Sequence, residues 1–235
     1  MNRREFSAGA ACLAASAALW PGALFAQFRP PVEGIEYVTL RKPVNGGVAQ
    51  GKVEVIEFFW YSCPHCNAFE PRLGAWIKKL PPDVVVKRVP VAFREDFVPQ
   101  QRLFYTLEAM GKVDELHGKV FQAIHVNRMP VNRDDTILAW ARQQGLDAAR
   151  FAELYKSPEI TDKARDALEL QDAFKVEGVP ALGIAGRYYT DGSLAGNMER
   201  ALQITDYLIA ETRKGPRQER SDDPKSVGGA ATLRR

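Results

Sequence analysis

Two cysteines, Cys63 and Cys66, are the side chains in this sequence best suited to do chemistry. They stand in the stretch WYSCPHC, directly after the apolar run VEVIEFF. A pair with this spacing can bind a metal, close a small disulfide, or exchange electrons with another thiol. A structural zinc site needs four ligands, and beyond this pair the sequence offers three histidines and no second close cysteine pair. A disulfide across so short a loop would constrain the unfolded chain little, so a redox role is favoured.

The segments around the cysteines are predicted to be a buried strand followed by a helix. The continuous apolar run over residues 53–61 is typical of a strand covered on both faces. If Cys63 is the N-cap of the helix and Pro64 lies in its first turn, unpaired backbone N–H groups stabilise a thiolate on Cys63. A protonated His65 would add positive charge. Stabilising that thiolate destabilises the disulfide relative to the dithiol, which makes a strong oxidant.

The rest of the pattern predicts an α/β fold interrupted by helices. A second strand over 84–93 completes a strand-helix-strand unit, which implies two parallel strands. After a long stretch with helical periodicity alone, two short strands meet near Gly186, and a last helix begins at Asn197. The predicted parts are a first α/β part (27–95), an all-helical insertion (96–175) and a second α/β part (176–213).

Both ends of the chain are predicted to lie outside the folded part. The first 26 residues join a charged head with two arginines to an apolar stretch ending in ALFA, which predicts a signal peptide cleaved near Gln27 after Sec or twin-arginine export. Cleavage would remove Cys12, leaving Cys63 and Cys66 as the only cysteines of an exported protein. Residues 214–235 are rich in Gly, Pro, Ser and charge, which predicts a disordered tail.

The charge distribution argues against a nucleic-acid-binding protein. The formal net charge of +3 is the sum of +1 on residues 1–26, +3 on residues 214–235, and therefore −1 on the part between them. The body of the protein thus has no basic excess that would attract a nucleic acid. The hydrophobic content of 46% and charged content of 26% of the full chain are those of a soluble globular protein.

Several stretches of the chain resemble the DsbA family of periplasmic thiol:disulfide oxidoreductases. They are EYVTLRKPV, EFFWYSCPHC, ARQQGLDAARFAELYKS and EGVPALGIAGRY, and the similarity covers roughly residues 34–212. The resemblance implies a thioredoxin fold with an inserted helical domain. It also implies oxidation of reduced, unfolded exported proteins and re-oxidation by a DsbB-like membrane quinone reductase. We expect a monomer with no cofactor, no metal ion and no nucleic-acid partner.

The resemblance also implies roles for individual residues. Cys63 matches the nucleophile that forms a mixed disulfide with the substrate, and Cys66 matches the resolving thiol. Val179 and Pro180 match a pair in which the proline follows a cis peptide bond and lies against the active site. Together with Tyr61, they are the residues expected to contact the substrate.

Glu57, within the run VEVIEFF, matches a buried acidic residue of the family. A buried carboxylate should have a raised pKa and a polar partner, and Lys87 or Arg88 could supply that partner. His117 and His125 fall in the predicted helical insertion, where we expect them to lie on the surface.

Three other functions are compatible with the cysteine motif. A disulfide isomerase of the DsbC or DsbG kind would need an N-terminal dimerisation domain. Only about ten residues separate Gln27 from the first predicted strand, which is too few for such a domain. A dedicated reductant, as in cytochrome maturation, would differ in its reduction potential. A redox-inactive peptide-binding or chaperone-like module would keep its binding activity after replacement of Cys63 by serine.

Overall fold

The strand that leads to the cysteines lies at the centre of the fold. The structure is a computed structural model that describes residues 29–44 and 51–214. All seven residues of β2 (Val53–Phe59) are buried, as its continuous β-branched and aromatic sequence predicts. β2 lies between β3 (Val84–Pro90), which runs parallel to it, and β4 (Ala181–Ile184), which runs antiparallel.

In the described residues, five strands form one mixed sheet in the order β1-β5-β4-β2-β3. β1 (Val38–Thr39) and β5 (Tyr188–Asp191) complete it, and β5 is antiparallel to both of its neighbours. The turn between β4 and β5 contains Gly186, whose φ of 61° is unfavourable for other residues. A side chain there would also collide with the carbonyl group of Val44, so this turn requires glycine.

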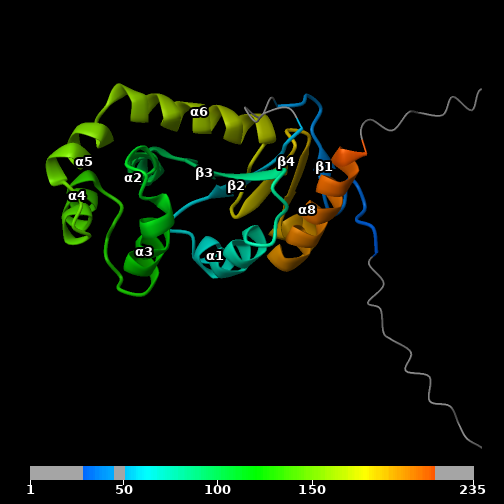
Figure 1. Ribbon diagram of the computed structural model, residues 1–235, viewed down its shortest axis with the longest axis horizontal. Coiled ribbons are helices and arrows are strands. Elements are labelled where there is room, and N and C mark those ends of the chain that lie inside the picture. The colour runs from blue at the N-terminus through cyan, green and yellow to red at the C-terminus, as the bar shows by residue number, and fades with distance from the viewer. Residues whose placement is uncertain (1–28, 45–50, 215–235) are drawn as a thin grey trace, which may run out of the picture. The chain divides into compact units, whose positions relative to one another are not determined.

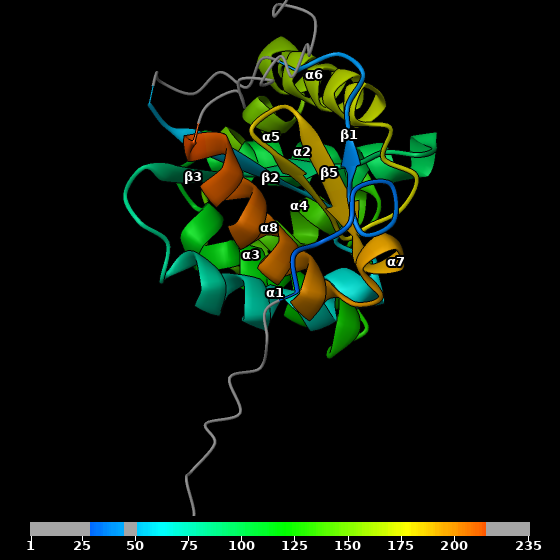
Figure 2. The same cartoon turned by 90° about the vertical axis from the view of Figure 1, so that its right-hand side faces the viewer.

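One face of the sheet is covered by α1 (Pro64–Ile77) and α8 (Met198–Arg213), and α6 (Pro158–Phe174) lies along the opposite face (Figures 1 and 2). Leu73 of α1 and Ile204 of α8 are both fully buried in the same apolar cluster against the sheet. The short helix α7 (Gly192–Ala195) comes just before α8. The sheet is therefore sandwiched between helices, which is the expected α/β fold class.

Between β3 and β4, all the regular elements of the described chain are helical. They are a 3-10 turn (Glu95–Phe97), α2 (Val98–Ala109), α3 (Val113–His125), α4 (Asp134–Gln143), α5 (Ala148–Tyr155) and α6 (Pro158–Phe174). α6 brings the chain back to the sheet, where the ring centroid of Phe174 is 5.3 Å from that of Phe58 in β2. These helices occupy the predicted interval of the insertion. The boundaries of the insertion as a separate domain stay a prediction.

The apolar core continues from the sheet into the helical insertion. One cluster of buried side chains contains both cysteines, Phe59 of β2, Phe104 of α2 and Phe121 of α3. The centroids of the Phe59 and Phe104 rings are 5.3 Å apart. The helices of the insertion therefore pack directly against the strand that leads to Cys63.

The predicted signal peptide and its cleavage near Gln27 lie outside the described residues. The same holds for the predicted tail beyond Lys214. Within the ranges that the structure describes, none of the helices has the length and apolar character needed to cross a membrane.

Candidate active site

The two cysteines lie where the chain passes from β2 into α1. The N–H of Cys63 donates to the carbonyl oxygen of Trp60 at 3.0 Å, which closes a tight turn directly after Phe59. This turn ends β2 two residues earlier than the apolar run predicts. Cys63 is the N-cap of α1 and Pro64 lies in its first turn, as the sequence predicts. Cys66 follows within the first turn of α1.

The two thiols have opposite environments. Both are free, but Cys63 is 7% exposed and Cys66 is fully buried. A hydrogen bond with the Cys66 thiol does most to lower the pKa of Cys63, to about 6. Burial opposes this shift, while the backbone N–H groups of Cys66 and His65 and the charge of His65 add to it. Burial, followed by the interaction with Cys63, raises the pKa of Cys66. The negative charge of the reduced pair therefore resides on Cys63.

The lowered Cys63 pKa agrees in direction with the sequence prediction, but its largest cause was not predicted. The predicted causes were the helix N–H groups and His65, which is exposed. The largest single cause is the Cys66 thiol, which the burial of Cys66 keeps protonated and able to donate.

Val179 and Pro180 lie beside Cys63, although Val179 is 116 residues away in the sequence. The Cys63 thiol donates to the Val179 carbonyl oxygen at 3.4 Å, and the peptide bond between Val179 and Pro180 is cis, as the resemblance implied. A groove of about 480 Å³ is lined by these two residues, by His65 and Arg72 of α1, and by residues around α7 and the start of α8. The groove opens beside the more acidic thiol.

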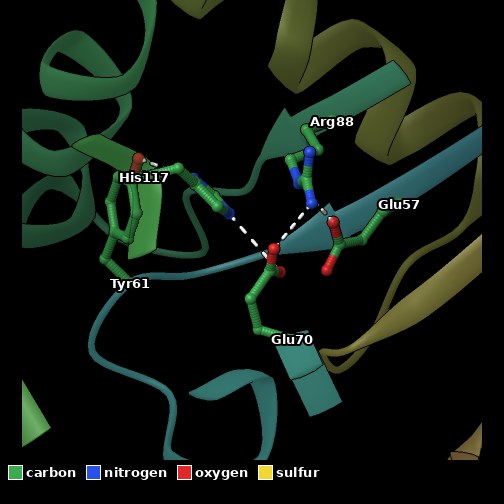
Figure 3. A network of polar contacts seen from close by, with 5 residues as sticks. All are labelled: Glu57, Tyr61, Glu70, Arg88 and His117. Carbon is green, nitrogen blue, oxygen red and sulfur yellow. Dashed lines mark hydrogen bonds and ion pairs between the residues drawn. The ribbon is translucent and has the colours of Figure 1, made fainter. Parts of the chain in front are cut away.

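A buried cluster of charged side chains lies close to Cys66, whose pKa is raised in part by the charge of Glu57. Glu57 is fully buried, and the Nε of Arg88 donates to its Oε2 at 3.1 Å. The Nη2 of Arg88 donates to Glu70 of α1 at 2.6 Å, so Arg88 joins the two carboxylates (Figure 3). Lys87 is exposed because neighbouring residues of a strand point to opposite faces. The partner of Glu57 is thus Arg88.

The environment of Glu57 favours its protonated form. Burial, followed by repulsion from Glu70, raises its pKa to about 8, and Arg88 only partly opposes this shift. The second carboxylate oxygen of Glu57, Oε1, is buried and has no hydrogen-bond partner among the described residues. Neither this cluster nor any other set of three or more His, Cys, Asp or Glu side chains in the described ranges could hold a metal ion.

Two histidines that we expected on the surface lie instead around Tyr61. His117 of α3 is 4% exposed, and its Nδ1 lies 2.9 Å from the Tyr61 hydroxyl group (Figure 3). Its Nε2 lies 3.5 Å from Oε2 of Glu70. His125, at the end of α3, is half-buried, and its Nε2 lies 2.8 Å from the Tyr61 carbonyl oxygen. The prediction was wrong because α3 packs over the residues that precede the cysteines.

The protonation of these groups follows from their burial. Burial raises the pKa of Tyr61 far above its usual range, so its phenol keeps the proton. Burial also lowers the pKa of His117 despite the nearby Glu70, so His117 is neutral. Its Nε2 faces the Glu70 carboxylate, which can only accept, so the ring proton is on Nε2 and Nδ1 accepts from the Tyr61 hydroxyl group. Burial acts to raise the pKa of Glu70, but the nearby His117, whose Nε2 is 3.5 Å from Oε2, and the charge and hydrogen bond of Arg88 outweigh it and lower that pKa.

Tyr61 was expected to contact the substrate. Its side chain is 1% exposed and points toward His117 (Figure 3). The sequence did not predict that Glu70 and His117 belong to this region. One signal was present: His117, Phe121 and His125 are spaced by four and so share one face of their helix.

Comparison with known proteins places this geometry in a family. The family described as DSBA-like thioredoxin domain matches residues 85–203. The thiol:disulfide interchange protein DsbA of Bordetella pertussis is 41% identical over 203 residues, which cover 86% of this chain and 96% of that protein. The protein of the same name from Pseudomonas aeruginosa is 39% identical over 181 residues, covering 77% and 85% of the two chains.

Solved structures agree with the sequence comparisons. The crystal structure of Pseudomonas aeruginosa DsbA matches with a TM-score of 0.74 and 38% identity, covering 78% of this chain and 95% of that one. The oxidoreductase DsbA from Xylella fastidiosa matches with a TM-score of 0.74 and 29% identity, covering 79% and 100%. With an acidic thiol at a helix start, a buried second thiol and a cis proline beside them, the chain belongs to the DsbA-like thioredoxin family and is a thiol:disulfide oxidoreductase.

Proposed function

We propose that the protein donates its Cys63–Cys66 disulfide to reduced, unfolded proteins exported to the periplasm. The observation that carries this proposal is the opposite shift of the two thiol pKa values, lowered to about 6 for Cys63 and raised for Cys66. A stabilised Cys63 thiolate exists only in the reduced pair. The reduced pair is therefore favoured over the disulfide, and the disulfide is readily given up.

The exchange takes place in two balanced steps. A substrate thiolate attacks Sγ of Cys63, and the new sulfur–sulfur bond forms as the Cys63–Cys66 bond breaks. The electron pair of the broken bond leaves on Cys66, which then takes up a proton. A second substrate thiolate attacks the substrate sulfur of the mixed disulfide, and Cys63 leaves as a stabilised thiolate. Two electrons have passed from the substrate to the protein, and the substrate holds a new disulfide.

Glu57 is the proposed source of the proton that Cys66 takes up. Its pKa of about 8 keeps most of it protonated at neutral pH, and its unpartnered Oε1 is buried in the same region as Cys66. Glu57→Gln should slow the attack of a thiol on the oxidised protein more than it slows the departure of Cys63 from a mixed disulfide. Stopped-flow measurement of both steps tests this, and equal effects would count against the assignment.

The groove beside Cys63 is the proposed binding site for an extended segment of the substrate. Pro180 is buried and has no N–H, while Val179 is partly exposed. Its carbonyl oxygen lies 3.4 Å from the Cys63 sulfur. In the disulfide form Cys63 has no proton to donate, so this oxygen can accept from an N–H of the substrate. Recognition through backbone groups does not depend on substrate sequence, which suits an enzyme that oxidises many unrelated chains.

Export and re-oxidation complete the proposed cycle. The predicted signal peptide would direct the chain to the periplasm by the Sec or the twin-arginine route. A DsbB-like membrane quinone reductase would accept the two electrons and restore the Cys63–Cys66 disulfide. The protein would act as a monomer and without a cofactor.

The experiment that tests this function is the redox equilibrium of residues 27–235 with glutathione. In a glutathione buffer poised at roughly −200 mV, a potential typical of oxidising cell compartments, we expect the protein to be mainly in the dithiol form. Alkylation of free thiols followed by mass measurement gives the reduced fraction. A protein that stays mainly oxidised in that buffer would be a reductant, and the proposal would fail.

A further inference from the structure

The turn that precedes Cys63 is held by side chains from the helical insertion. Gln100 of α2 is 1% exposed, and its Oε1 accepts from the Ser62 N–H at 3.2 Å. Its Nε2 donates to the Ser62 hydroxyl oxygen at 2.8 Å and to the Val131 carbonyl oxygen at 2.7 Å. One buried amide thus ties the residue before Cys63 to two different parts of the insertion.

The residue before Ser62 is held by the insertion as well. The Nε2–H of His125 donates to the Tyr61 carbonyl oxygen at 2.8 Å, and His117 accepts from the Tyr61 hydroxyl group at 2.9 Å. Phe121 packs between these two histidines on α3, with its ring centroid 5.1 Å from that of Tyr61. Both the backbone and the side chain of Tyr61 are therefore fixed by α3.

These contacts supply partners to backbone groups that the strand and the helix leave unpaired. β2 ends at Phe59, and α1 begins at Pro64, so the intervening peptide groups belong to neither element. Among the described residues, the partner of the Ser62 N–H is Gln100 and the partner of the Tyr61 carbonyl is His125. Buried or half-buried peptide groups require such partners.

We propose that Gln100 and His125, supported by His117, are positioning residues that hold the turn over residues 60–62 and thereby the orientation of Cys63. The inference rests on the proposed role of Cys63 as the attacked sulfur. The turn is bonded to Cys63 itself, whose N–H donates to the Trp60 carbonyl oxygen at 3.0 Å.

The orientation of Cys63 matters because its thiolate depends on directed hydrogen bonds. The N–H groups of His65 and Cys66 stabilise Sγ only while Cys63 keeps its N-cap geometry. A turn that has lost its anchors would let Cys63 sample other orientations, and the thiolate would be less stabilised. Loss of the hydrogen bond from Gln100 or His125 should therefore change the Cys63 pKa as well as the stability of the protein.

Gln101 provides a matched control for Gln100. It is the next residue of α2, is also 1% exposed, and its Nε2 donates to the Pro90 carbonyl oxygen at 2.7 Å. Its hydrogen bond holds the end of β3 and does not reach the turn before Cys63. Gln100→Ala and Gln101→Ala thus each remove a buried amide from the same helix.

The test measures the Cys63 pKa by thiolate absorbance, the glutathione equilibrium, and the free energy of unfolding of each variant. Gln100→Ala should raise the Cys63 pKa and shift the glutathione equilibrium about threefold to tenfold toward the disulfide, which corresponds to about 0.5 to 1 pKa unit. Gln101→Ala should lower the stability while leaving the equilibrium within about twofold of the unmodified protein. If the two variants lose stability and neither changes the thiol, the role of Gln100 is structural and the proposal is overturned.

His125 keeps the proposal testable if Gln100→Ala fails to fold, because His125 is half-buried at the end of its helix. His125→Ala removes the donor to Tyr61, whereas His125→Gln keeps an N–H that can reach the same oxygen. We expect His125→Ala to shift the glutathione equilibrium and His125→Gln to restore most of it. Equal equilibria for both variants would overturn the proposal. Every comparison is made with the unmodified protein, so a failure of the oxidant function would appear in that protein itself and stay distinguishable.

Discussion

Cys63 and Cys66 are separated by two residues, yet their surroundings shift the pKa values of the two thiols in opposite directions. Around Cys63, a neighbouring thiol and helix N–H groups lower the pKa to about 6. Around Cys66, burial and the charges of Cys63 and Glu57 raise it. The difference arises because the N-cap lies at the edge of a groove, while the side chain one turn later points into the core. A short spacing can therefore separate a good leaving group from a strong proton acceptor.

The two sides of the active site also differ in how they are built. The Cys63 side is formed by the start of α1 and the groove that Val179 and Pro180 line. The Cys66 side includes a charged cluster from three elements, Glu57 of β2, Arg88 of β3 and Glu70 of α1. The first side borders a groove, whereas the second is buried and favours the protonated form of Glu57. Four predictions test this contrast.

Replacing each cysteine should give the largest and most different effects. Cys63→Ser should reduce the oxidation of a reduced test peptide to the uncatalysed rate, because the attacked sulfur is gone. Cys66→Ser should leave a reactive Cys63 that accumulates as a mixed disulfide, because no buried thiol can resolve it. Mass measurement after incubation with an oxidised peptide detects this adduct. Absence of the adduct with Cys66→Ser would contradict the roles of Cys63 as the sulfur of the mixed disulfide and of Cys66 as the thiol that resolves it.

Glu57 should make the folded dithiol protein less stable as the pH rises. Its pKa is raised from 4.5 to about 8, so its contribution to stability is fully present below pH 4.5 and is lost as the pH rises through 8. The loss amounts to a few kcal/mol at about 1.4 kcal/mol per pKa unit. Glu57→Gln should remove this decline in the free energy of unfolding, measured with urea between pH 5 and pH 8. If the unfolding free energy of Glu57→Gln declined with pH as steeply as that of the unmodified protein, the raised pKa of Glu57 would be contradicted.

Cys63 should make the folded dithiol protein more stable as the pH rises, over a pH range that partly overlaps that of Glu57. Its pKa is lowered from 9.0 to about 6, so its contribution to stability is present above pH 9 and is lost as the pH falls through 6. We expect roughly 2 kcal/mol, about half of the full 1.4 kcal/mol per unit, because Cys63 is not fully enclosed and solvent partly screens its thiolate. Comparing the unfolding free energies of the dithiol protein and Cys63→Ser across this pH range isolates the contribution of the Cys63 thiolate to stability. Parallel pH profiles for the two proteins would contradict it.

His65 should have the smallest effect of the four. Its charge is the last of the contributions that lower the Cys63 pKa, and its side chain is exposed to screening solvent. His65→Gln should raise the Cys63 pKa by less than about one unit and shift the glutathione equilibrium by less than about tenfold. A larger effect would show that the charge of His65, and not the Cys66 thiol, dominates the Cys63 side.

The fold could be predicted from local patterns to a large extent. The buried strand, the helix that starts at Cys63, and the helices between β3 and β4 follow from periodicity, capping and proline positions. Ser157 and Pro158 illustrate this, because serine is a favoured N-cap residue and proline a favoured first residue of a helix. The Ser157 side chain caps α6 by accepting from the N–H of Ile160, and Pro158 begins that helix. Element ends were less accurate, because the turn at Trp60 stops β2 before its apolar residues run out.

The site was predictable only where its chemistry is local. The sequence by itself determined that Cys63 is the N-cap of α1, because that position depends on its immediate neighbours, and hence the direction of its pKa shift. The burial of Cys66, which keeps the Cys66 thiol protonated and so supplies the largest part of that shift, was decided by the tertiary structure. The tertiary structure decided that Arg88 is the partner of Glu57 and that His117 and His125 surround Tyr61. Those pairings depend on strand register and helix packing between residues 31 to 64 positions apart. They also depend on burial, which sets pKa values and which no short stretch of sequence encodes.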